Sequence, residues 1–337
     1  MSILKVENLV TNFSTDQGTV QAVRGISFEV KQQEVLGIVG ESGSGKSVTM
    51  FSVMGLLADN GRVDDGKIYF EEQDISPSHL DKAARKTYEK QMQKLRGNDI
   101  AMIFQDPMTF LNPVLKIGKQ LMEPILIHDK CSKKEAKERA LNLMNLVGIP
   151  SPQSRFNQYP HQFSGGMRQR IIIAIALACN PKLIIADEPT TALDVTIQAQ
   201  VLELIQKIQA DRGSSVIMIT HDLGVVASMC DRILIMYGGK IVEEGTDREI
   251  FYKPKHPYTI GLLACVHNPD STSKEALVPI PGSPPDLLNP PVGCPFVDRC
   301  EHAMLVCKQM MPDETRFSDT HLCRCWLNHK FAKEAKV

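Results

Sequence analysis

The sequence predicts an α/β fold organised around one glycine-rich loop, and three observations predict it. Residues 40–47 read Gly-Glu-Ser-Gly-Ser-Gly-Lys-Ser, with an apolar, strand-like run before them and a segment of helical character after them. Three further apolar runs end at a polar residue, namely Gln105, Asp187 and His221. Because ligand-contacting groups stand at the carboxyl ends of strands in an open α/β sheet, we expect these residues to meet at one edge.

The loop matches the pattern G-x-x-x-x-G-K-[ST] in its required setting, after a strand at 35–39 and before a helix at 48–57. Its glycines let backbone N–H groups turn inward around a phosphate, and the helix N-terminus adds positive charge. Lys46 then reaches the β- and γ-phosphates, and Ser47 places its hydroxyl on Mg²⁺. The alternative is a turn that binds nothing. The predicted nucleotide-binding residues are Gly40, Ser42, Gly43, Ser44, Gly45, Lys46 and Ser47.

At 337 residues the chain is long for one core and short for three, which predicts one main domain and an appendage. Its 38 basic and 39 acidic residues show no charge excess that favours nucleic acid. The longest apolar run, 171–179, has about half of the ~18 residues that a membrane span needs. We expect a cytosolic, soluble chain whose nine cysteines are free thiols or metal ligands.

The N-terminal part predicts β-structure, with strands at 3–6, 20–23, 26–30 and 66–70, followed by a charged helix at 81–96. Phe13 lies between the first two strands. It is either an ordinary core or surface aromatic, or a residue that stacks on a nucleotide base, which contributes about 1–3 kcal/mol in nucleic-acid complexes.

The middle of the chain predicts a strand at 100–104 that ends at Gln105, and then a helical region from about 114 to 180. The clearest amphipathic helix is 133–147. Ser164 is a candidate N-cap, and Gly165 and Gly166 would leave its helix N-terminus open to an anion. An ordinary capped helix start is the alternative.

Two adjacent carboxylates, Asp187 and Glu188, close the apolar strand predicted at 183–188. In P-loop enzymes the first of such a pair holds Mg²⁺ and the second polarises an attacking water. Adjacent residues on a strand point to opposite sides, so we assign them separate roles. The remaining predicted elements are a helix at 196–211, a strand at 215–220 and a hairpin at 231–237 and 240–244.

From residue 3 to 248 the chain resembles the ATP-binding subunits of ABC transporters, whose six motifs it carries in the family's order. These are Walker A at 40–47, the Q-loop at Gln105, the signature at 164–167, Walker B at 183–188, the D-loop at 191–194 and the H-loop at His221. The resemblance implies a P-loop NTPase fold of the ABC cassette type in residues 1–248. Such a cassette has a RecA-like core, an N-terminal antiparallel β subdomain and a helical subdomain, here at about 114–180.

Residues 37–47, 104–108 and 256–259 resemble the importer branch for oligopeptides, dipeptides and nickel. The signature reads Phe-Ser-Gly-Gly-Met instead of the generic Leu-Ser-Gly-Gly-Gln, which resembles the D-type member of the branch's two ATPase subunits. The resemblance implies a heterodimer with a second ATPase, two membrane-spanning permease subunits and, indirectly, an extracytoplasmic solute-binding protein. It implies a peripheral position on the cytoplasmic face of the cell membrane and no nucleic-acid partner.

The resemblance also implies that the nucleotide lies between two subunits. Glu188 would be the general base, His221 would orient the γ-phosphate and the water, and Phe13 would stack on adenine. Gln105 would link Mg²⁺ to the membrane-spanning partners, with Ser47 and Asp187 as further magnesium ligands. The implied contacts around the signature and D-loop are Ser164, Gly165, Gly166 and Asp194.

The function so implied is ATP hydrolysis that powers import of dipeptides, oligopeptides or a related solute. Three alternatives remain: an ABC ATPase that acts on ribosomes or DNA, an importer subunit for nickel or another non-peptide solute, and a redox-sensing regulatory subunit. The first is disfavoured, because such proteins usually carry two cassettes or a long coiled-coil insertion. The sequence does not identify the solute, which the ATPase subunit does not touch.

Residues 249–337 form a C-terminal extension of different composition. Seven prolines within 279–295 exclude a helix or a central strand and predict an extended linker. Five cysteines crowd into 294–325: Cys294, Cys300, Cys307, Cys323 and Cys325. The spacings C-x5-C and C-x6-C fit neither a zinc ribbon nor the common ferredoxin patterns, so spacing leaves the metal open.

The cysteine segment resembles the C-terminal extension of peptide-importer ATPases, which implies a [4Fe-4S] cluster. In that pattern the last ligand stands just before a Trp or His, which selects Cys325 beside Trp326 and leaves Cys323 as a spare thiol. The implied ligands are Cys294, Cys300, Cys307 and Cys325. A Zn²⁺ site and four reduced structural cysteines are the alternatives. The scattered cysteines are treated as buried or incidental: Cys131, Cys179, Cys230 and Cys265.

Overall fold

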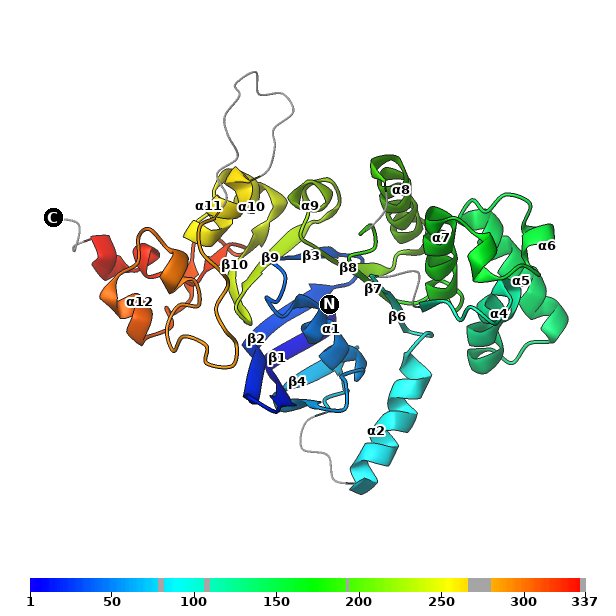
Figure 1. Cartoon of the computed structure of the whole chain (residues 1–337), viewed down its shortest axis with the longest axis horizontal. Coiled ribbons are helices and arrows are strands. Elements are labelled where there is room, and N and C mark those ends of the chain that lie inside the picture. The colour runs from blue at the N-terminus through cyan, green and yellow to red at the C-terminus, as the bar shows by residue number, and fades with distance from the viewer. Residues whose placement is uncertain (78–81, 106–109, 192–193, 266–279, 334–337) are drawn as a thin grey trace, which may run out of the picture. The chain divides into compact units, whose positions relative to one another are not determined.

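The computed structural model describes residues 1–77, 82–105, 110–191, 194–265 and 280–333, whose helices and strands are shown in Figure 1. The chain divides into two compact units. Unit 1 comprises Met1, Val30–Glu34 and Asp81–Ile219, and unit 2 comprises Ser2–Glu29, Val35–Leu80 and Thr220–Val337. Parts of the sequence predictions lie outside the described residues, at positions 81, 106–108, 192–193, 279 and 334–337.

A four-stranded sheet with the order β2-β1-β4-β5 forms the N-terminal part of unit 2. Its strands are β1 (Ser2–Thr15), β2 (Gly18–Lys31), β4 (Gly61–Phe70) and β5 (Gln73–Asp74). The strands predicted at 3–6, 20–23, 26–30 and 66–70 are confirmed and extend further than expected. β1 and β4 pair antiparallel, and their burial alternates along the chain, as in strands with one face on a core.

The second sheet of unit 2 has the order β11-β12-β10-β9-β3. Its strands are β3 (Val35–Val39), β9 (Arg232–Tyr237), β10 (Lys240–Thr246), β11 (Thr315–Arg316) and β12 (Leu322–Cys323). The predicted hairpin is confirmed: Gly238 and Gly239 both have positive φ, at 52° and 76°, as a tight two-residue turn requires. The cysteine segment contributes β12, which pairs antiparallel with β10.

Short helices complete unit 2. They are α1 (Lys46–Met54), α9 (Leu223–Met229), α10 (Asp247–Tyr252), α11 (Pro257–Ala264) and α12 (Leu305–Gln309), with 3-10 turns η2 (Val297–Arg299), η3 (Trp326–Asn328) and η4 (Lys330–Lys333). Helix α1 packs on β1 and β4, and α10 packs on β9 and β10.

Unit 1 contains parallel strands β6 (Ile100–Ile103), β7 (Leu183–Asp187) and β8 (Ser215–Thr220), all fully buried. Its helices are α2 (Lys82–Leu95), α4 (Ile117–His128), α5 (Lys133–Leu146), α6 (Pro152–Arg155), α7 (Gly165–Ala176) and α8 (Val195–Arg212), with the 3-10 turn η1 (Pro160–Gln162). Helix α4 packs on α5 and α7, which confirms the helical region. In the described part of the chain, no helix is both long and apolar enough to cross a bilayer.

The strand predicted at 183–188 ends one residue early, at Asp187. Glu188 has φ 47°, in the left-handed region that residues with a Cβ rarely adopt. The expectation that the two carboxylates alternate across a strand is therefore wrong, because Glu188 has already left the strand conformation.

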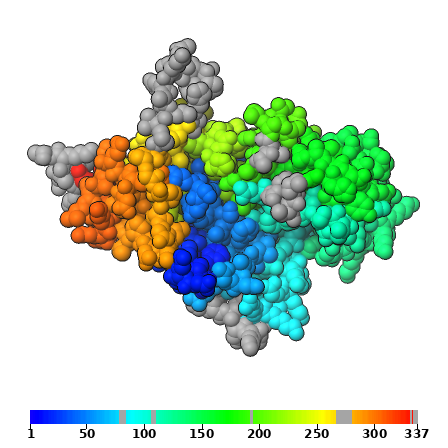
Figure 2. Space-filling view, viewed as in Figure 1, coloured from blue at the N-terminus to red at the C-terminus, as the bar shows by residue number. Residues whose placement is uncertain are grey.

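The described part of the proline-rich segment, 280–293, forms no helix or strand but is fastened to the N-terminal sheet. The Gln21 N–H of β2 donates to the Leu287 carbonyl over 2.8 Å, and the Arg24 guanidinium donates to the Pro291 carbonyl over 2.6 Å. Figure 2 shows the orange segment lying against the blue N-terminal residues. The prolines exclude regular structure, and hydrogen bonds to the carbonyls of Leu287 and Pro291 hold the segment in place.

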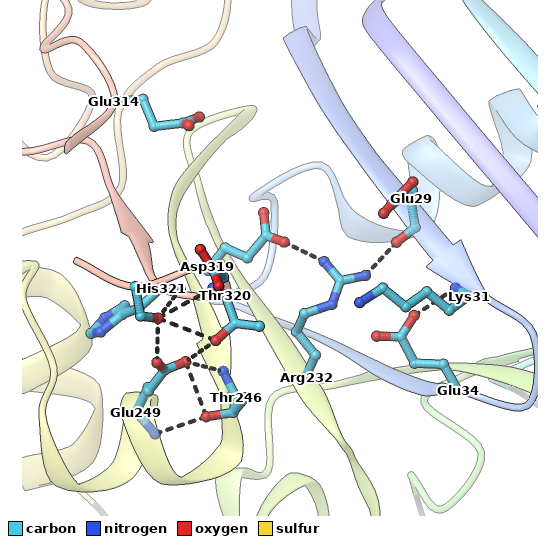
Figure 3. A network of polar contacts seen from close by, with 12 residues as sticks. Glu29, Lys31, Glu34, Arg232, Thr246, Glu249, Glu314, Asp319, Thr320 and His321 are labelled. Carbon is cyan, nitrogen blue, oxygen red and sulfur yellow. Dashed lines mark hydrogen bonds and ion pairs between the residues drawn. The ribbon is translucent and has the colours of Figure 1, made fainter. Parts of the chain in front are cut away.

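Hydrogen bonds also fasten the cysteine segment to β10 and α10 (Figure 3). Glu249 forms a capping box with Thr246 and accepts hydrogen bonds from the Ser318 and Thr320 hydroxyls, over 2.6 and 2.9 Å. Burial opposes ionisation of Glu249, but these hydrogen bonds outweigh it and lower the pKa of the carboxyl to about 2. The buried Glu243 of β10 lies 2.9 Å from His321 Nε2. The segment is thus part of the fold of unit 2.

His256 caps α11 and predicts a pH-dependent stability. Its Nδ1 accepts a hydrogen bond from the Tyr258 N–H over 3.1 Å, and burial lowers the pKa of the imidazole from 6.5 to about 3. In the unfolded chain the His256 imidazole binds a proton near pH 6.5, whereas in the folded chain it stays neutral down to about pH 3. The contribution of this group to the stability of the fold is therefore complete above pH 6.5 and is lost as the pH falls toward 3. We expect the free energy of unfolding to fall by up to about 1.4 kcal/mol for each pH unit below pH 6, because of His256 alone.

Urea denaturation between pH 7 and pH 5 measures the effect. The matched control is His256→Asn, because an asparagine oxygen can also cap the helix but does not titrate. The wild-type stability should fall more steeply with acid than that of the variant. Equal slopes would contradict the assignment.

Candidate functional site

The glycine-rich loop joins β3 to α1, and its shape depends on the glycines at 40, 43 and 45. Gly43 and Gly45 have φ of 78° and 99°, the left-handed region that favours glycine. A Cβ on Gly40 would lie 2.1 Å from the Met236 carbonyl oxygen, and one on Gly45 would lie 2.5 Å from the Ala22 carbonyl oxygen. Space outside Gly43 is open. The loop therefore packs closely against β9 and β2, and its tip at Gly43 points outward.

Lys46 opens α1 and folds back over the loop. Its Nζ donates to the Gly40 carbonyl over 2.7 Å and to the Glu41 carbonyl over 3.0 Å, and the residue is only 5% exposed. No acidic residue stands in the first turn of α1. The ammonium group, the helix N-terminus and the exposed backbone at 42–43 together favour an anion.

Ser44 shows that the loop fits a bound group. Its Oγ is buried and has no hydrogen-bond partner among the described atoms. Buried hydroxyls are normally satisfied, so an unpaired one beside Lys46 is the kind of donor that a phosphate oxygen would accept from. The loop and Ser47 at the start of α1 thus fit a nucleotide phosphate chain with its magnesium ion.

Phe13 lies on β1, half-buried, and pairs across the sheet with Gly61 of β4. A Cβ on Gly61 would lie 2.6 Å from the Phe13 ring, so the glycine makes room for the aromatic side chain. Stacking of Phe13 on a base stays a prediction.

A polar side chain that follows β6 contacts one that follows β7, at the sheet edge where the sequence predicts that Gln105, Asp187 and His221 lie. The Gln105 side-chain amide donates to Glu188 Oε2 over 2.9 Å, and the Thr191 hydroxyl donates to the same oxygen over 3.0 Å. Asp187, the last residue of β7, is 3% exposed. His221 follows β8 directly, next to β7 in the parallel sheet. Thr191 is a contact that sequence reasoning missed, although it stands within the D-loop motif.

The backbone at Glu188 is strained. A left-handed conformation costs a residue with a Cβ about 1–2 kcal/mol, and the following Pro189 restricts this residue further. The Glu188 N–H donates to the Ile219 carbonyl of β8 over 2.9 Å, which holds it there. Strain that the surrounding structure maintains is typical of functional sites.

Ser164 is the N-cap of α7, as predicted: its Oγ accepts a hydrogen bond from the Met167 N–H over 3.3 Å. A Cβ on Gly165 would meet only open space, whereas one on Gly166 would lie 2.8 Å from the Ile197 side chain of α8. Asp194 caps α8 by accepting from the Ile197 N–H over 3.0 Å. Ser164, Gly165 and Asp194 are all exposed, so these two helix N-termini face outward.

The four predicted cluster ligands all belong to the cysteine segment and differ in burial. Cys294, Cys307 and Cys325 are buried and Cys300 is half-buried. The Cys294 N–H donates to the Cys307 carbonyl over 2.8 Å. Burial and the neighbouring thiols of Cys325, Cys307 and Cys300 raise the pKa of Cys294 to about 12. Within the described ranges, no three His, Cys, Asp or Glu residues are grouped as for a metal ion.

Sequence reasoning also missed Tyr258 and Arg299, both of which contact Glu41 of the loop. The Tyr258 hydroxyl accepts from the Glu41 N–H over 2.9 Å, and Arg299 Nη1 lies 2.7 Å from Glu41 Oε2. Tyr258 belongs to the stretch 256–259 that resembles the importer branch, and Arg299 stands between two cysteines without a motif of its own. Their distance of more than 200 positions from the loop left no local signal.

Two family models match the chain: "ABC transporter" over residues 23–191, and "Oligopeptide/dipeptide transporter, C-terminal region" over residues 242–307. The dipeptide transport ATP-binding protein DppD of Bacillus subtilis is 54% identical over 334 residues, which cover 99% of this chain and 97% of that protein. The oligopeptide transport ATP-binding protein OppD of Escherichia coli is 48% identical and covers 96% of this chain and 93% of its own.

Among solved structures, the ADP- and Pi-bound dimer of the ATP-binding cassette MJ0796 superposes with a TM-score of 0.63 at 28% identity. The match covers 73% of this chain and 99% of that one. The predicted ABC cassette fold is therefore confirmed. With a family model and near full-length relatives in agreement, this chain belongs to the ATP-binding proteins of ABC transporters and is an ABC ATPase.

Proposed function

We propose that this ABC ATPase powers the import of dipeptides or oligopeptides across the cell membrane. The observation that carries the proposal is the similarity over nearly the full length to dipeptide and oligopeptide transport ATP-binding proteins, at 54% and 52% identity in Bacillus subtilis. The similarity includes the C-terminal region that matches the oligopeptide/dipeptide transporter model. This region favours peptide import over action on ribosomes or DNA.

The chain's own residues have distinct roles in this proposal. The loop N–H groups, Lys46 and Ser44 hold the phosphates, and Phe13 stacks on the base. Glu188 takes the proton of the attacking water, which His221 orients. Bound MgATP supplies the phosphoanhydride bond whose cleavage drives the cycle. The magnesium ligands are Ser47, Gln105 and Asp187. The hydrogen bond between Gln105 and Glu188 supports a shared task for those two residues.

A second ATPase subunit completes each site. Ser164, Gly165 and Asp194 stand at exposed helix N-termini, where their N–H groups can approach the nucleotide of a partner. Met167 in the signature favours a partner of different sequence, and hence a heterodimer. The ATPases would join two permease subunits from the cytoplasmic side, and a solute-binding protein would act on the other side. Residues 1–248 would then form the cassette and 249–337 its extension.

We further propose that Cys294, Cys300, Cys307 and Cys325 hold a [4Fe-4S] cluster. What supports the proposal is that the four cysteines lie in one segment and that neighbouring thiols raise the pKa of Cys294, Cys300 and Cys325, so these thiols lie near one another. Bound iron would keep the thiols deprotonated against the effect of burial.

Anaerobically purified protein should therefore absorb near 400 nm and contain about four iron atoms per chain, because four cysteines ligate such a cluster. Cys300→Ala should lose both signals. Cys323→Ala is the matched control and should keep them, since Cys323 is the spare thiol of the pattern. One zinc per chain without iron would overturn this assignment in favour of a zinc site.

The transport proposal is tested by co-expressing the chain with its membrane-spanning partners and reconstituting the purified complex in vesicles. ATP-dependent uptake of labelled dipeptides or oligopeptides is the expected result. The control complex carries Lys46→Met in this chain. Uptake of Ni²⁺ without uptake of peptides would show instead that the complex transports a metal.

A further inference from the structure

Glu41, the second residue of the phosphate loop, is held at all three of its polar groups. Its carbonyl oxygen accepts from Lys46 Nζ over 3.0 Å and from the Ser44 N–H over 3.2 Å. Its N–H donates to the Tyr258 hydroxyl over 2.9 Å, and its carboxylate accepts from Arg299 Nη1 over 2.7 Å. Residues of the loop bind the Glu41 carbonyl, and residues of the C-terminal region bind the Glu41 N–H and carboxylate.

Arg299 is itself fixed in one position. Its Nε and Nη2 donate to the Pro281 and Ile280 carbonyls over 2.9 and 3.0 Å, and Nη1 also donates to the Tyr237 hydroxyl over 3.0 Å. Its side chain is 6% exposed, against 27% for Glu41. An ion pair of this kind is shielded from water and costs little side-chain entropy, because the guanidinium is already held by other bonds.

Aromatic packing fixes Tyr258, whose hydroxyl accepts the hydrogen bond from the Glu41 N–H. The ring of Tyr258 lies 4.5 Å from that of Tyr237 and 5.3 Å from that of Phe296, and the Arg299 guanidinium lies 5.7 Å from the Tyr237 ring. Phe296 and Arg299 lie between Cys294 and Cys300 in sequence. The cysteine segment therefore carries Arg299 itself and Phe296, which packs on the ring of Tyr258.

We propose that Arg299 and Tyr258 are positioning residues for nucleotide binding: they hold Glu41, and through it the phosphate loop, in the conformation that accepts phosphates. The inference rests on the proposed nucleotide site. Rotation of the Glu41 peptide would displace the Lys46 ammonium and the N–H groups of residues 42–44. The apparent dissociation constant of the nucleotide is inversely proportional to the fraction of chains whose loop has the binding-competent conformation.

The test measures the dissociation constants of ATP and ADP for the full chain by titration with a fluorescent nucleotide. Arg299→Gln should weaken both about tenfold, since hydrogen bonds to charged groups contribute about 1.5–3 kcal/mol. Arg299→Lys should recover part of the affinity, because its ammonium keeps the charge. Tyr258→Phe should weaken binding by a smaller factor. The matched control is Arg316→Gln, an exposed arginine of the same segment that pairs with Glu314.

Glu41 variants separate positioning from a general loss of structure. Glu41→Gln should weaken nucleotide binding as Arg299→Gln does, and the double variant should be no worse than either single variant, because both act through one ion pair. If the Arg299→Gln variant does not fold, the nucleotide affinity of the Glu41→Gln variant tests the proposal by itself. Unchanged affinity in Glu41→Gln, or additive losses in the double variant, would overturn the inference. A wild-type chain that binds no ATP would instead contradict the proposed nucleotide site.

Discussion

Glu188→Gln is expected to reduce ATP hydrolysis by several orders of magnitude in the purified transporter while ATP binding is retained. Glutamine keeps the size of the side chain and an oxygen that can accept from Gln105 and Thr191, so the strand ends should remain in place. It cannot take up a proton from water. General bases typically contribute about 10²–10⁴-fold to a rate, which sets the lower part of the expected range.

Phosphate release and nucleotide binding are measured on the same preparation. Glu203→Gln is the matched control, because Glu203 is an exposed glutamate of α8 in the same unit. Near-normal turnover in Glu188→Gln would exclude Glu188 as the base. A loss of ATP binding would show that the carboxylate is needed to build the site.

Lys46→Met is expected to weaken ATP binding by about 100-fold or more. Methionine keeps the apolar stem but removes the ammonium, and with it charge-assisted hydrogen bonds that contribute about 1.5–3 kcal/mol each. The substitution also removes the bonds to the Gly40 and Glu41 carbonyls, so the empty loop should lose rigidity.

Titration with a fluorescent nucleotide measures the change, and Lys67→Met provides the control. Lys67 is an exposed lysine of β4 in the same unit, paired with Asp74. Its replacement should leave the affinity unchanged. If Lys46→Met bound ATP as tightly as the wild type, the loop could not be the phosphate site that the sequence predicts.

The phosphate loop could be predicted from the sequence because its geometry is local. Glycines at 40, 43 and 45 are needed for close approach or for positive φ, and the lysine follows directly at the helix start. The caps at Ser164 and Asp194 are local for the same reason: each side chain bonds an N–H three residues ahead. The placement of Gln105 at the same sheet edge as Asp187 needed one more rule, that neighbouring parallel strands end at one edge.

Glu188 marks the point at which local reasoning failed. The apolar run before it predicts a strand through residue 188, and propensity contains no signal for a left-handed glutamate. A backbone bond to Ile219 of the next strand maintains that conformation. Similarly, the prolines of 280–293 predict a linker, whereas hydrogen bonds to β2 make the segment part of unit 2.

The sequence by itself determined which chemistry this protein carries, because phosphate-binding loops, helix caps and strand-end carboxylates are set by residues within a few positions of one another. Only the tertiary structure decided what surrounds the loop. Tyr258 and Arg299 contact Glu41 from 217 and 258 positions away, because the C-terminal region packs on the phosphate loop within unit 2. Such contacts depend on how distant elements pack, for which a short window of sequence has no periodicity and no spacing rule.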